Sequence, residues 1–210
     1  MRQVAVVQAR LSSKRFPRKC LADLNGKPVI QHVIDRAWQI TGIDEVVLAV
    51  PGCDLLAFKP FGESAWLVGF SERYDTDVLG RYRLAAEDVS ADVVMRLTGD
   101  CPVFDPIVAG QVLELFHASQ PCDFASNDTL ISGWPDGFDV SCFSRAALET
   151  AAAQATELAD REHIECWFKR PENGMRCVTL MAPEKWTGPK LSVDCEDDLR
   201  VVREWLAQCG

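Results

Sequence analysis

The chain has 210 residues, of which 48% are hydrophobic and 25% are charged, so its composition excludes an intrinsically disordered protein. With 31 acidic and 22 basic residues, its formal net charge of −9 argues against a protein that binds duplex nucleic acid through a basic face. No apolar run approaches the roughly 20 residues of a membrane span, so we expect a cytoplasmic protein without membrane partners.

The first half of the chain predicts alternating strands and helices. The strands expected there are residues 4–7, 45–50, 65–68 and 93–97. The helices expected there follow Pro28, cover residues 78–89, and run from the N-cap pair Asp105 and Pro106 to about His117. Such alternation is typical of a doubly wound α/β protein with a mostly parallel sheet flanked by helices.

The second half of the chain predicts a less regular order. The strands expected there are residues 138–143, 176–181 and 190–193, and the helices are residues 144–159 and 196–208. Because no internal repeat or linker divides the sequence, we expect a single domain over residues 1–210, with a small flap around residues 123–190.

A basic loop follows the first predicted strand. Residues 8–19, QARLSSKRFPRK, carry the cations Arg10, Lys14, Arg15, Arg18 and Lys19. Ligands of open α/β sheets collect beyond the carboxyl ends of strands, and basic residues beside small hydroxyl residues are typical of phosphate sites. The segment matches neither the GxGxxG fingerprint nor the P-loop. It predicts a site for a small anionic ligand, and a solvated basic loop is the alternative interpretation.

Two aspartates follow predicted strands at distant places in the chain. Asp100 comes after residues 93–97 and a glycine, and Asp194 comes after residues 190–193. Two strand-end carboxylates that converge would suit Mg²⁺, which takes few protein oxygens and completes its octahedron with phosphates and water. The alternative for Asp100 is a turn or N-cap role.

Two smaller clusters complete the candidate residues. WPDGFDV, residues 134–140, places Asp136 in a turn before a predicted strand that carries Asp139. DREHIE, residues 160–165, brings Arg161, Glu162 and His163 together on a predicted helix. Turn chemistry alone is the alternative for Asp136, and a surface or structural histidine is the alternative for His163.

Taken together, these motifs resemble those of the sugar-acid cytidylyltransferases. Residues 8–19 are similar to the QAR-x-GS-[TK]-R-x-PGK loop of that family. Further motifs follow in the order found in the branch called spore coat polysaccharide biosynthesis protein F: DTDVLGRY (75–82), RLTGDCPVFDP (96–106), WPDGFDV, REHIE (161–165) and SVDCEDDL (192–199). The resemblance covers residues 4–205, nearly the whole chain.

The resemblance implies a Rossmann-like nucleotidyltransferase fold of the kind shared with GT-A glycosyltransferases. The implied reaction transfers CMP from CTP to an acidic sugar, ulosonic or nonulosonic, and releases pyrophosphate, for surface polysaccharide biosynthesis. It also implies a homodimer, a Mg²⁺ cofactor, and a sugar-binding or dimerisation role for the flap around residues 123–190.

The resemblance also assigns roles to residues of this sequence. Lys19, Asp100 and Asp194 would be catalytic, and Asp100 and Asp194 would bind the metal. The nucleotide-binding residues would be Gln8, Ala9, Arg10, Ser12, Ser13, Lys14, Arg15 and Lys19. The sugar-binding residues would be Asp136, Asp139, Arg161 and His163. The candidates for holding the sugar carboxylate are Arg73, Arg81 and Arg161.

The chain departs from the family pattern at two glycines. Ser12 and Arg18 stand where the family loop has glycine, a residue often required by a positive φ. This departure keeps open a non-catalytic nucleotide-binding subunit. The other alternative is a GT-A-type glycosyltransferase that uses a nucleotide sugar, although residues 97–101 offer one aspartate where such enzymes usually have a DxD motif.

Overall fold

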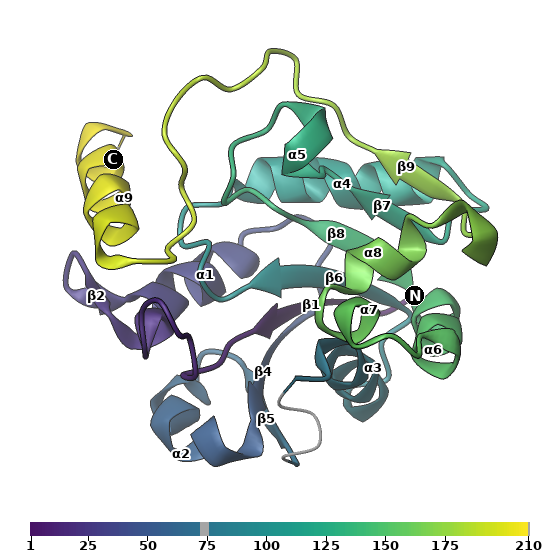
Figure 1. Cartoon of the computed structure of the whole chain (residues 1–210), viewed down its shortest axis with the longest axis horizontal. Helices are drawn as coiled ribbons and strands as arrows, with labels where there is room; N and C mark the ends of the chain where they lie inside the picture. The colour runs from purple at the N-terminus through teal and green to yellow at the C-terminus, as the bar shows by residue number, and fades with distance from the viewer. Residues whose placement is uncertain (72–75, 210) are drawn as a thin grey trace.

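The computed structural model describes residues 1–71 and 76–209, and these residues form a mixed seven-stranded sheet (Figure 1). Its order is β5 (Trp66–Phe70), β4 (Glu45–Pro51), β1 (Gln3–Gln8), β6 (Val93–Thr98), β8 (Ser141–Ser144), β7 (Phe124–Ser126) and β9 (Cys177–Thr179). The first four strands are parallel, β8 runs antiparallel to both of its neighbours, and β7 is parallel to β9. The predicted mostly parallel α/β sheet is confirmed.

Helices cover both faces of the sheet. One face holds α1 (Val29–Ala37) and α4 (Pro106–Ala118), and the other holds α3 (Val78–Asp88), α6 (Arg145–Gln154) and α8 (Ile164–Phe168). Alternate residues of β1 enter the two cores, Ala5 and Val7 on one side and Val4 and Val6 on the other. Within the described residues no helix has the length and apolar character to cross a membrane.

Short elements complete the chain. The hairpin of β2 (Asp23–Leu24) and β3 (Lys27–Pro28) precedes α1. The remaining short helices are α2 (Leu55–Phe58), α5 (Thr129–Ser132), α7 (Leu158–Glu162), η1 (Lys19–Leu21), η2 (Gly52–Asp54), η3 (Lys59–Phe61) and η5 (Pro171–Asn173). The predicted start of α4 is confirmed, because the Asp105 side chain accepts the Ile107 N–H and Pro106 occupies the first turn.

The second half of the chain differs from the sequence expectations in several places: β7 and α5 were not expected, and the strand expected at 176–181 covers only Cys177–Thr179. The strand expected at 138–143 begins only at Ser141, because residues before it form a turn closed by the Phe138 N–H on the Pro135 carbonyl. The helix expected at 144–159 ends at Gln154. The strand expected at 190–193 is absent, and that prediction is wrong: the Leu191 and Val193 N–H groups bond to single carbonyls of Asp136 and Asp100 rather than to a ladder.

The C-terminal helix α9 (Glu196–Cys209) packs on a core of its own. This third core joins Leu199 and Val202 of α9 to Leu191 and Val193 of the preceding segment and to Val103. Leu24 and Val29, from the β2–β3 hairpin and α1, complete it. The last part of the chain is thereby held against the carboxyl end of the sheet, beside the loop that follows β1 (Figure 1).

Candidate active site

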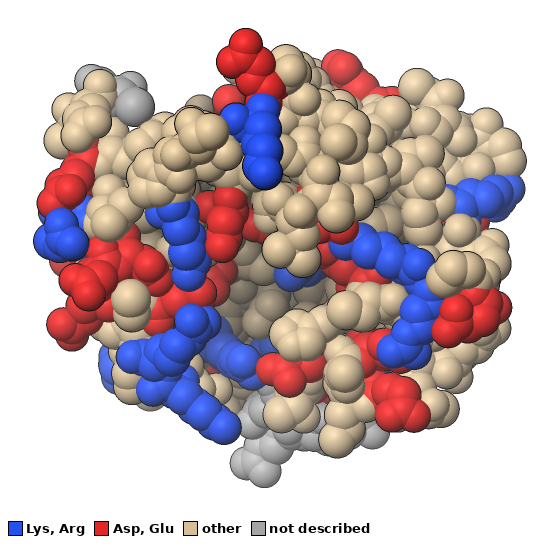
Figure 2. Space-filling view, turned by 45° about the horizontal axis from the view of Figure 1, so that its top comes forward, with Lys and Arg blue, Asp and Glu red and all other residues tan. Residues whose placement is uncertain are grey.

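A polar cavity of about 690 Å³ opens at the carboxyl ends of β1 and β6. Figure 2 shows a hollow of this kind, with basic and acidic side chains gathered around it. The residues that line the cavity are Arg10, Ser12, Ser13, Lys14, Arg15, Lys19, Thr76, Asp100, Glu162 and Asp194. The basic loop and both aspartates therefore meet at one place, as the sequence predicts. Gln8 and Ala9 lie just behind it, where they line a smaller adjoining cavity with Lys19 and Asp100.

Lys19 joins the two aspartates. Its Nζ lies 2.5 Å from Oδ2 of Asp100 and 2.8 Å from Oδ1 of Asp194, residues 81 and 175 positions away in the chain. The Lys19 side chain is only 12% exposed. Burial alone would lower the pKa of Lys19, but its two ion pairs outweigh burial and raise that pKa above 10.5. The three side chains form one compact charged unit on the cavity wall.

Asp194 is surrounded by cations. Its Oδ1 lies 2.9 Å from Nη2 of Arg15 as well as close to Lys19, and its Oδ2 lies 2.6 Å from Nζ of Lys190. Burial alone would raise the pKa of Asp194, but the bonds from Lys19 and Lys190 hold it well below its usual range. Asp194 is therefore a permanent anion near neutral pH.

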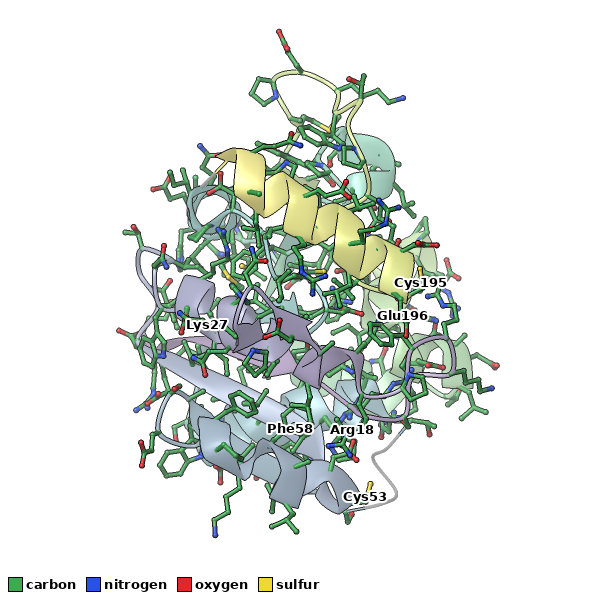
Figure 3. The ribbon with its side chains drawn as sticks, turned by 90° about the vertical axis from the view of Figure 1, so that its left-hand side faces the viewer. Arg18, Lys27, Cys53, Phe58, Cys195 and Glu196 are labelled. Carbon is green, nitrogen blue, oxygen red and sulfur yellow. The ribbon has the colours of Figure 1, made fainter. Side chains whose placement is uncertain are left out.

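The backbone around Asp194 is fixed by three connections. The Val193 N–H donates to the Asp100 carbonyl at 2.8 Å, which ties the two aspartate segments directly together. The carboxylate of Asp198, in the first turn of α9, accepts the N–H groups of Asp194 and Cys195. Figure 3 shows Cys195 and Glu196 at this end of α9, on the same side of the molecule as the loop that carries Arg18.

The turn at Asp136 and Gly137 is the third connection. The Asp136 carbonyl accepts the Leu191 N–H, and its side chain accepts the Ser192 hydroxyl at 2.6 Å. Gly137 has a φ of +105°, and a Cβ placed there would lie 2.5 Å from the Leu191 carbonyl carbon. Only glycine allows this close approach. The WPDGFDV motif thus supports the segment that carries Asp194.

Hydrogen bonds from backbone N–H groups fix the conformation of the basic loop. The Leu11 N–H donates to Oδ2 of Asp54, and the Arg18 N–H donates to the Leu11 carbonyl. Arg18 has a φ of +61°, the conformation that the family glycine would take at no steric cost. Ser12 is not among the residues with positive φ. Of the two missing glycines, only the one replaced by Arg18 leaves a strained backbone.

The structure does not bring the predicted sugar-binding residues into the cavity wall. Asp139 accepts hydrogen bonds from the Thr129 hydroxyl and the Gly137 N–H, and burial raises the pKa of its carboxyl. The Arg161 guanidinium donates to the Asp77 carboxylate, to the Ala152 carbonyl in α6 and to the Ala155 carbonyl just after α6. His163 is exposed between α7 and α8. Their sugar-binding roles stay predictions.

One of the candidates for a sugar carboxylate, Arg81, does not reach the cavity either. Arg81 is fully buried within α3. Arg73 and the first residue of the DTDVLGRY motif, Asp75, lie outside the described residues.

Sequence reasoning missed three charged residues of the site. Glu162 lines the cavity and lies 3.3 Å from Nη2 of Arg10. Lys190 donates to the side chain of Asp194, and Asp198 accepts the backbone N–H of Asp194. Glu162 and Asp198 fall within the REHIE and SVDCEDDL motifs, but those motifs gave them no role of their own: Asp198 is already explained by the dipole of a helix that begins at Glu196. No sequence signal separates Lys190 from an ordinary surface charge.

The donor set suits a hard divalent cation. Two carboxylates, from Asp100 and Asp194, point at a single cationic group, the Lys19 ammonium. Mg²⁺ is commonly bound by one or two carboxylates together with substrate phosphates and water. Asp100 and Asp194 are therefore the residues that could hold such an ion.

Comparison with known proteins identifies the family. The family model described as cytidylyltransferase matches residues 4–176. The chain belongs to the cytidylyltransferase family. An 8-amino-3,8-dideoxy-manno-octulosonate cytidylyltransferase of Shewanella amazonensis is 35% identical over 118 residues, which are 56% of this chain and 48% of that relative. This chain thus spans about half the length of that curated cytidylyltransferase.

Two solved structures share the fold. A cytidylyltransferase from Leptospira borgpetersenii has a TM-score of 0.89 at 21% identity, with 99% of this chain and 87% of that one covered. A CMP:2-keto-3-deoxy-manno-octonic acid synthetase in complex with CTP has a TM-score of 0.78 at 22% identity, with both chains fully covered. The nucleotidyltransferase fold and the cytidylyltransferase family predicted from the motifs are confirmed. The spore coat branch stays a prediction.

Proposed function

We propose that this cytidylyltransferase transfers CMP from CTP to a ulosonic or nonulosonic sugar acid, with release of pyrophosphate, for surface polysaccharide biosynthesis. The observation that carries the proposal is the single cavity that joins the cations of residues 10–19 to the carboxylates of Asp100 and Asp194. Curated relatives named for this activity on octulosonates support the choice of substrate.

The chain's own cations would bind the nucleotide. Lys14, Arg15 and Lys19 line the cavity from one loop and would hold the β- and γ-phosphates. A sugar hydroxyl attacks the α-phosphorus, a new P–O bond forms, and the bond to the β-phosphate breaks, so that pyrophosphate leaves. Negative charge increases on oxygens beside these side chains, and their task is positioning and electrostatic stabilisation.

Asp100 and Asp194 would hold the Mg²⁺ ion of the reaction. Such an ion would supply Lewis-acid stabilisation of the phosphate charge. The three contacts that fix the backbone of Asp194 would keep its carboxylate aimed at the same point as that of Asp100. The sugar would bind beside the nucleotide, and Asp136, Asp139, Arg161 and His163, which do not line the cavity, remain the residues proposed to contact it.

We also propose a homodimer in the cytoplasm. Leu130 and Ile131 of α5 and Met181 after β9 are 93%, 65% and 58% exposed, and they line a shallow groove of about 290 Å³. Exposed apolar groups that lie together commonly mark an interaction surface. This apolar face would meet a second copy of the chain.

The experiment is pyrophosphate release by the purified protein with Mg²⁺, each of the four nucleoside triphosphates, and a panel of ulosonic and nonulosonic acids. We expect turnover with CTP and at least one sugar acid, and a loss of at least 100-fold in kcat in Asp100→Asn. Asp105→Asn is the matched control, because asparagine keeps the N-cap of α4 outside the cavity.

Three results would contradict the proposal. The first is no pyrophosphate release with any sugar acid, and the second is full turnover by a folded Asp100→Asn variant. The third is release of free nucleoside diphosphate from a nucleotide sugar, which would favour a glycosyltransferase.

A further inference from the structure

The Lys19 ammonium lies where two carboxylates converge. It is 2.5 Å from Asp100 and 2.8 Å from Asp194, and the Lys19 side chain is 12% exposed. Among the basic side chains that line this cavity, Lys19 is the one that contacts both aspartates: Arg15 reaches Asp194 alone, and its side chain is 69% exposed. Lys19 is therefore the cation that bridges the two carboxylates in this structure.

This position is incompatible with a divalent cation on the same two oxygens. Mg²⁺ binds carboxylate oxygens at roughly 2.0 to 2.1 Å and requires near-octahedral surroundings. An ammonium within hydrogen-bond distance of Oδ2 of Asp100 and Oδ1 of Asp194 fills the space between them. A divalent ion can use both oxygens only after Lys19 has moved away.

Lys19 needs a new anionic partner to leave. A largely buried ammonium that loses both carboxylates at once is left without compensation for its lost hydration. A free metal ion brings no anion, whereas a triphosphate brings several oxygens into the cavity that Lys14 and Arg15 also line. The departure of Lys19 is thus favourable only when the nucleotide binds, because the phosphates replace the two carboxylates as its anionic partners.

Asp194 stays anchored when Lys19 moves. Its other oxygen, Oδ2, lies 2.6 Å from Nζ of Lys190, and its backbone N–H donates to Asp198. Lys190 also lies 3.4 Å from Asp198, so it joins the carboxylate to the first turn of α9. Oδ1 of Asp194 can therefore lose the Lys19 ammonium while the Asp194 side chain keeps its orientation.

We propose that Lys19 occupies the carboxylate pair until a nucleotide arrives, so that the site rejects a free divalent cation and accepts one only together with the triphosphate. This inference rests on the proposed function for the identity of the nucleotide. The exchange of one cation for another depends on Lys19, Asp100 and Asp194, and on Arg15, which also lies 2.9 Å from Oδ1 of Asp194.

The test measures binding of Mn²⁺ alone, without nucleotide, by electron paramagnetic resonance of the free ion. We expect Lys19→Met to bind one Mn²⁺ at least tenfold more tightly than the wild type. We expect the gain to disappear in the double variant Lys19→Met with Asp100→Asn, because the ion then lacks one carboxylate. Lys14→Met removes the same charge from the same cavity without touching either aspartate, and we expect a change of less than threefold.

Three results would overturn the inference. They are equal Mn²⁺ affinity in the wild type and Lys19→Met, an equal gain in Lys14→Met, or a gain that survives Asp100→Asn. Lys19→Gln replaces Lys19→Met if the methionine variant does not fold, as judged by circular dichroism. Because the readout needs no turnover, failure of pyrophosphate release would count against the proposed function and leave this result standing.

Discussion

The charged side chains of the cavity have unequal roles at the scale of single residues. Lys19, Asp100 and Asp194 contact one another directly, whereas Lys14 and Arg18 are exposed on the same loop. Arg18 also adopts a left-handed backbone at φ +61°, which is unfavourable for a residue with a Cβ. The loop thus keeps the backbone conformation that the family glycine would adopt, and the Arg18 side chain adds a positive charge.

The first prediction concerns that strain. We expect Arg18→Gly to raise the free energy of unfolding by about 0.5 to 1 kcal/mol, because relief of the left-handed backbone exceeds the entropy that glycine adds to the unfolded chain. Urea unfolding at pH 7 measures the change. Lys14→Gly is the control, since Lys14 has no positive φ, and it should lower stability. Equal effects of the two variants would contradict the argument.

At the scale of elements, the turn before β8 and the segment before α9 act as one unit. Gly137 lies so close to Leu191 and Ser192 that no side chain fits between them. The same segment continues into Asp194. The geometry of the turn is therefore transmitted to the Asp194 carboxylate, which we propose holds the metal ion.

The second prediction follows from this contact. We expect Gly137→Ala to lower kcat/KM for CTP at least tenfold and the free energy of unfolding by about 1 to 3 kcal/mol, because the new Cβ displaces residues 191–193. Gly174→Ala is the control for a positive φ, here +66°, at a position with nothing within 4 Å of the added atom. Steady-state kinetics of pyrophosphate release would show equal losses if the contact with Leu191 were unimportant.

The third prediction concerns the β7–β9 pair. Arg176 makes a bidentate ion pair with Asp123, with Nε at 2.9 Å and Nη2 at 3.1 Å, just before the two strands begin. These hydrogen bonds from Arg176 hold the pKa of the Asp123 carboxyl below its ordinary 3.8. Because the folded pKa lies below the unfolded value, the stabilisation is present above about pH 4 and is lost as the pH falls through the folded pKa.

We therefore expect Asp123→Asn to lower the free energy of unfolding by about 1 kcal/mol at pH 7, a modest value because Arg176 is half exposed. The difference from the wild type should shrink steadily below pH 4 in urea titrations. Asp197→Asn, at a side chain that is 88% exposed, should change stability little at any pH. A difference that is constant down to pH 2 would contradict the ion-pair explanation.

At the scale of the whole molecule, an apolar face lies apart from the charged cavity. It comprises Leu130, Ile131 and Met181, the groove residues proposed as the dimer contact. The fourth prediction is that Ile131→Ser with Met181→Ser converts a dimer into a monomer in light scattering after size exclusion. Leu158→Ser, at another exposed leucine that is 79% accessible, should leave the mass unchanged. A wild-type monomer would refute the dimer.

The sequence predicted most of the sheet because strands such as β1 and β4 contain unbroken apolar runs that end at loop residues. The three-residue strand β7 escaped prediction because so short a segment has no recognisable period. The strand expected at residues 190–193 was wrong because its apolar residues serve the core beneath α9 rather than a ladder. The pattern of apolar residues alone does not distinguish a strand from a segment that packs beneath a helix.

The same limit applies to the site. Asp100 and Asp194 were predictable because each follows a segment that the sequence suggested as a strand and each matches a family motif. Glu162 and Lys190 were not, because their importance comes from the distances to Arg10 and Asp194, which arise only when remote segments pack together. Single charges of this kind are common on any protein surface.

The backbone bond from Val193 to Asp100 has a consequence for how the enzyme can be silenced. One of the two carboxylates arrives on a segment that packs on the outside of the sheet through a small core of its own. A local unfolding of residues 189–209 would leave the seven strands intact but would remove Asp194 from the site. Such an opening costs less free energy than unfolding of the whole domain. Catalytic competence would then decay before structural integrity as denaturant or temperature rises.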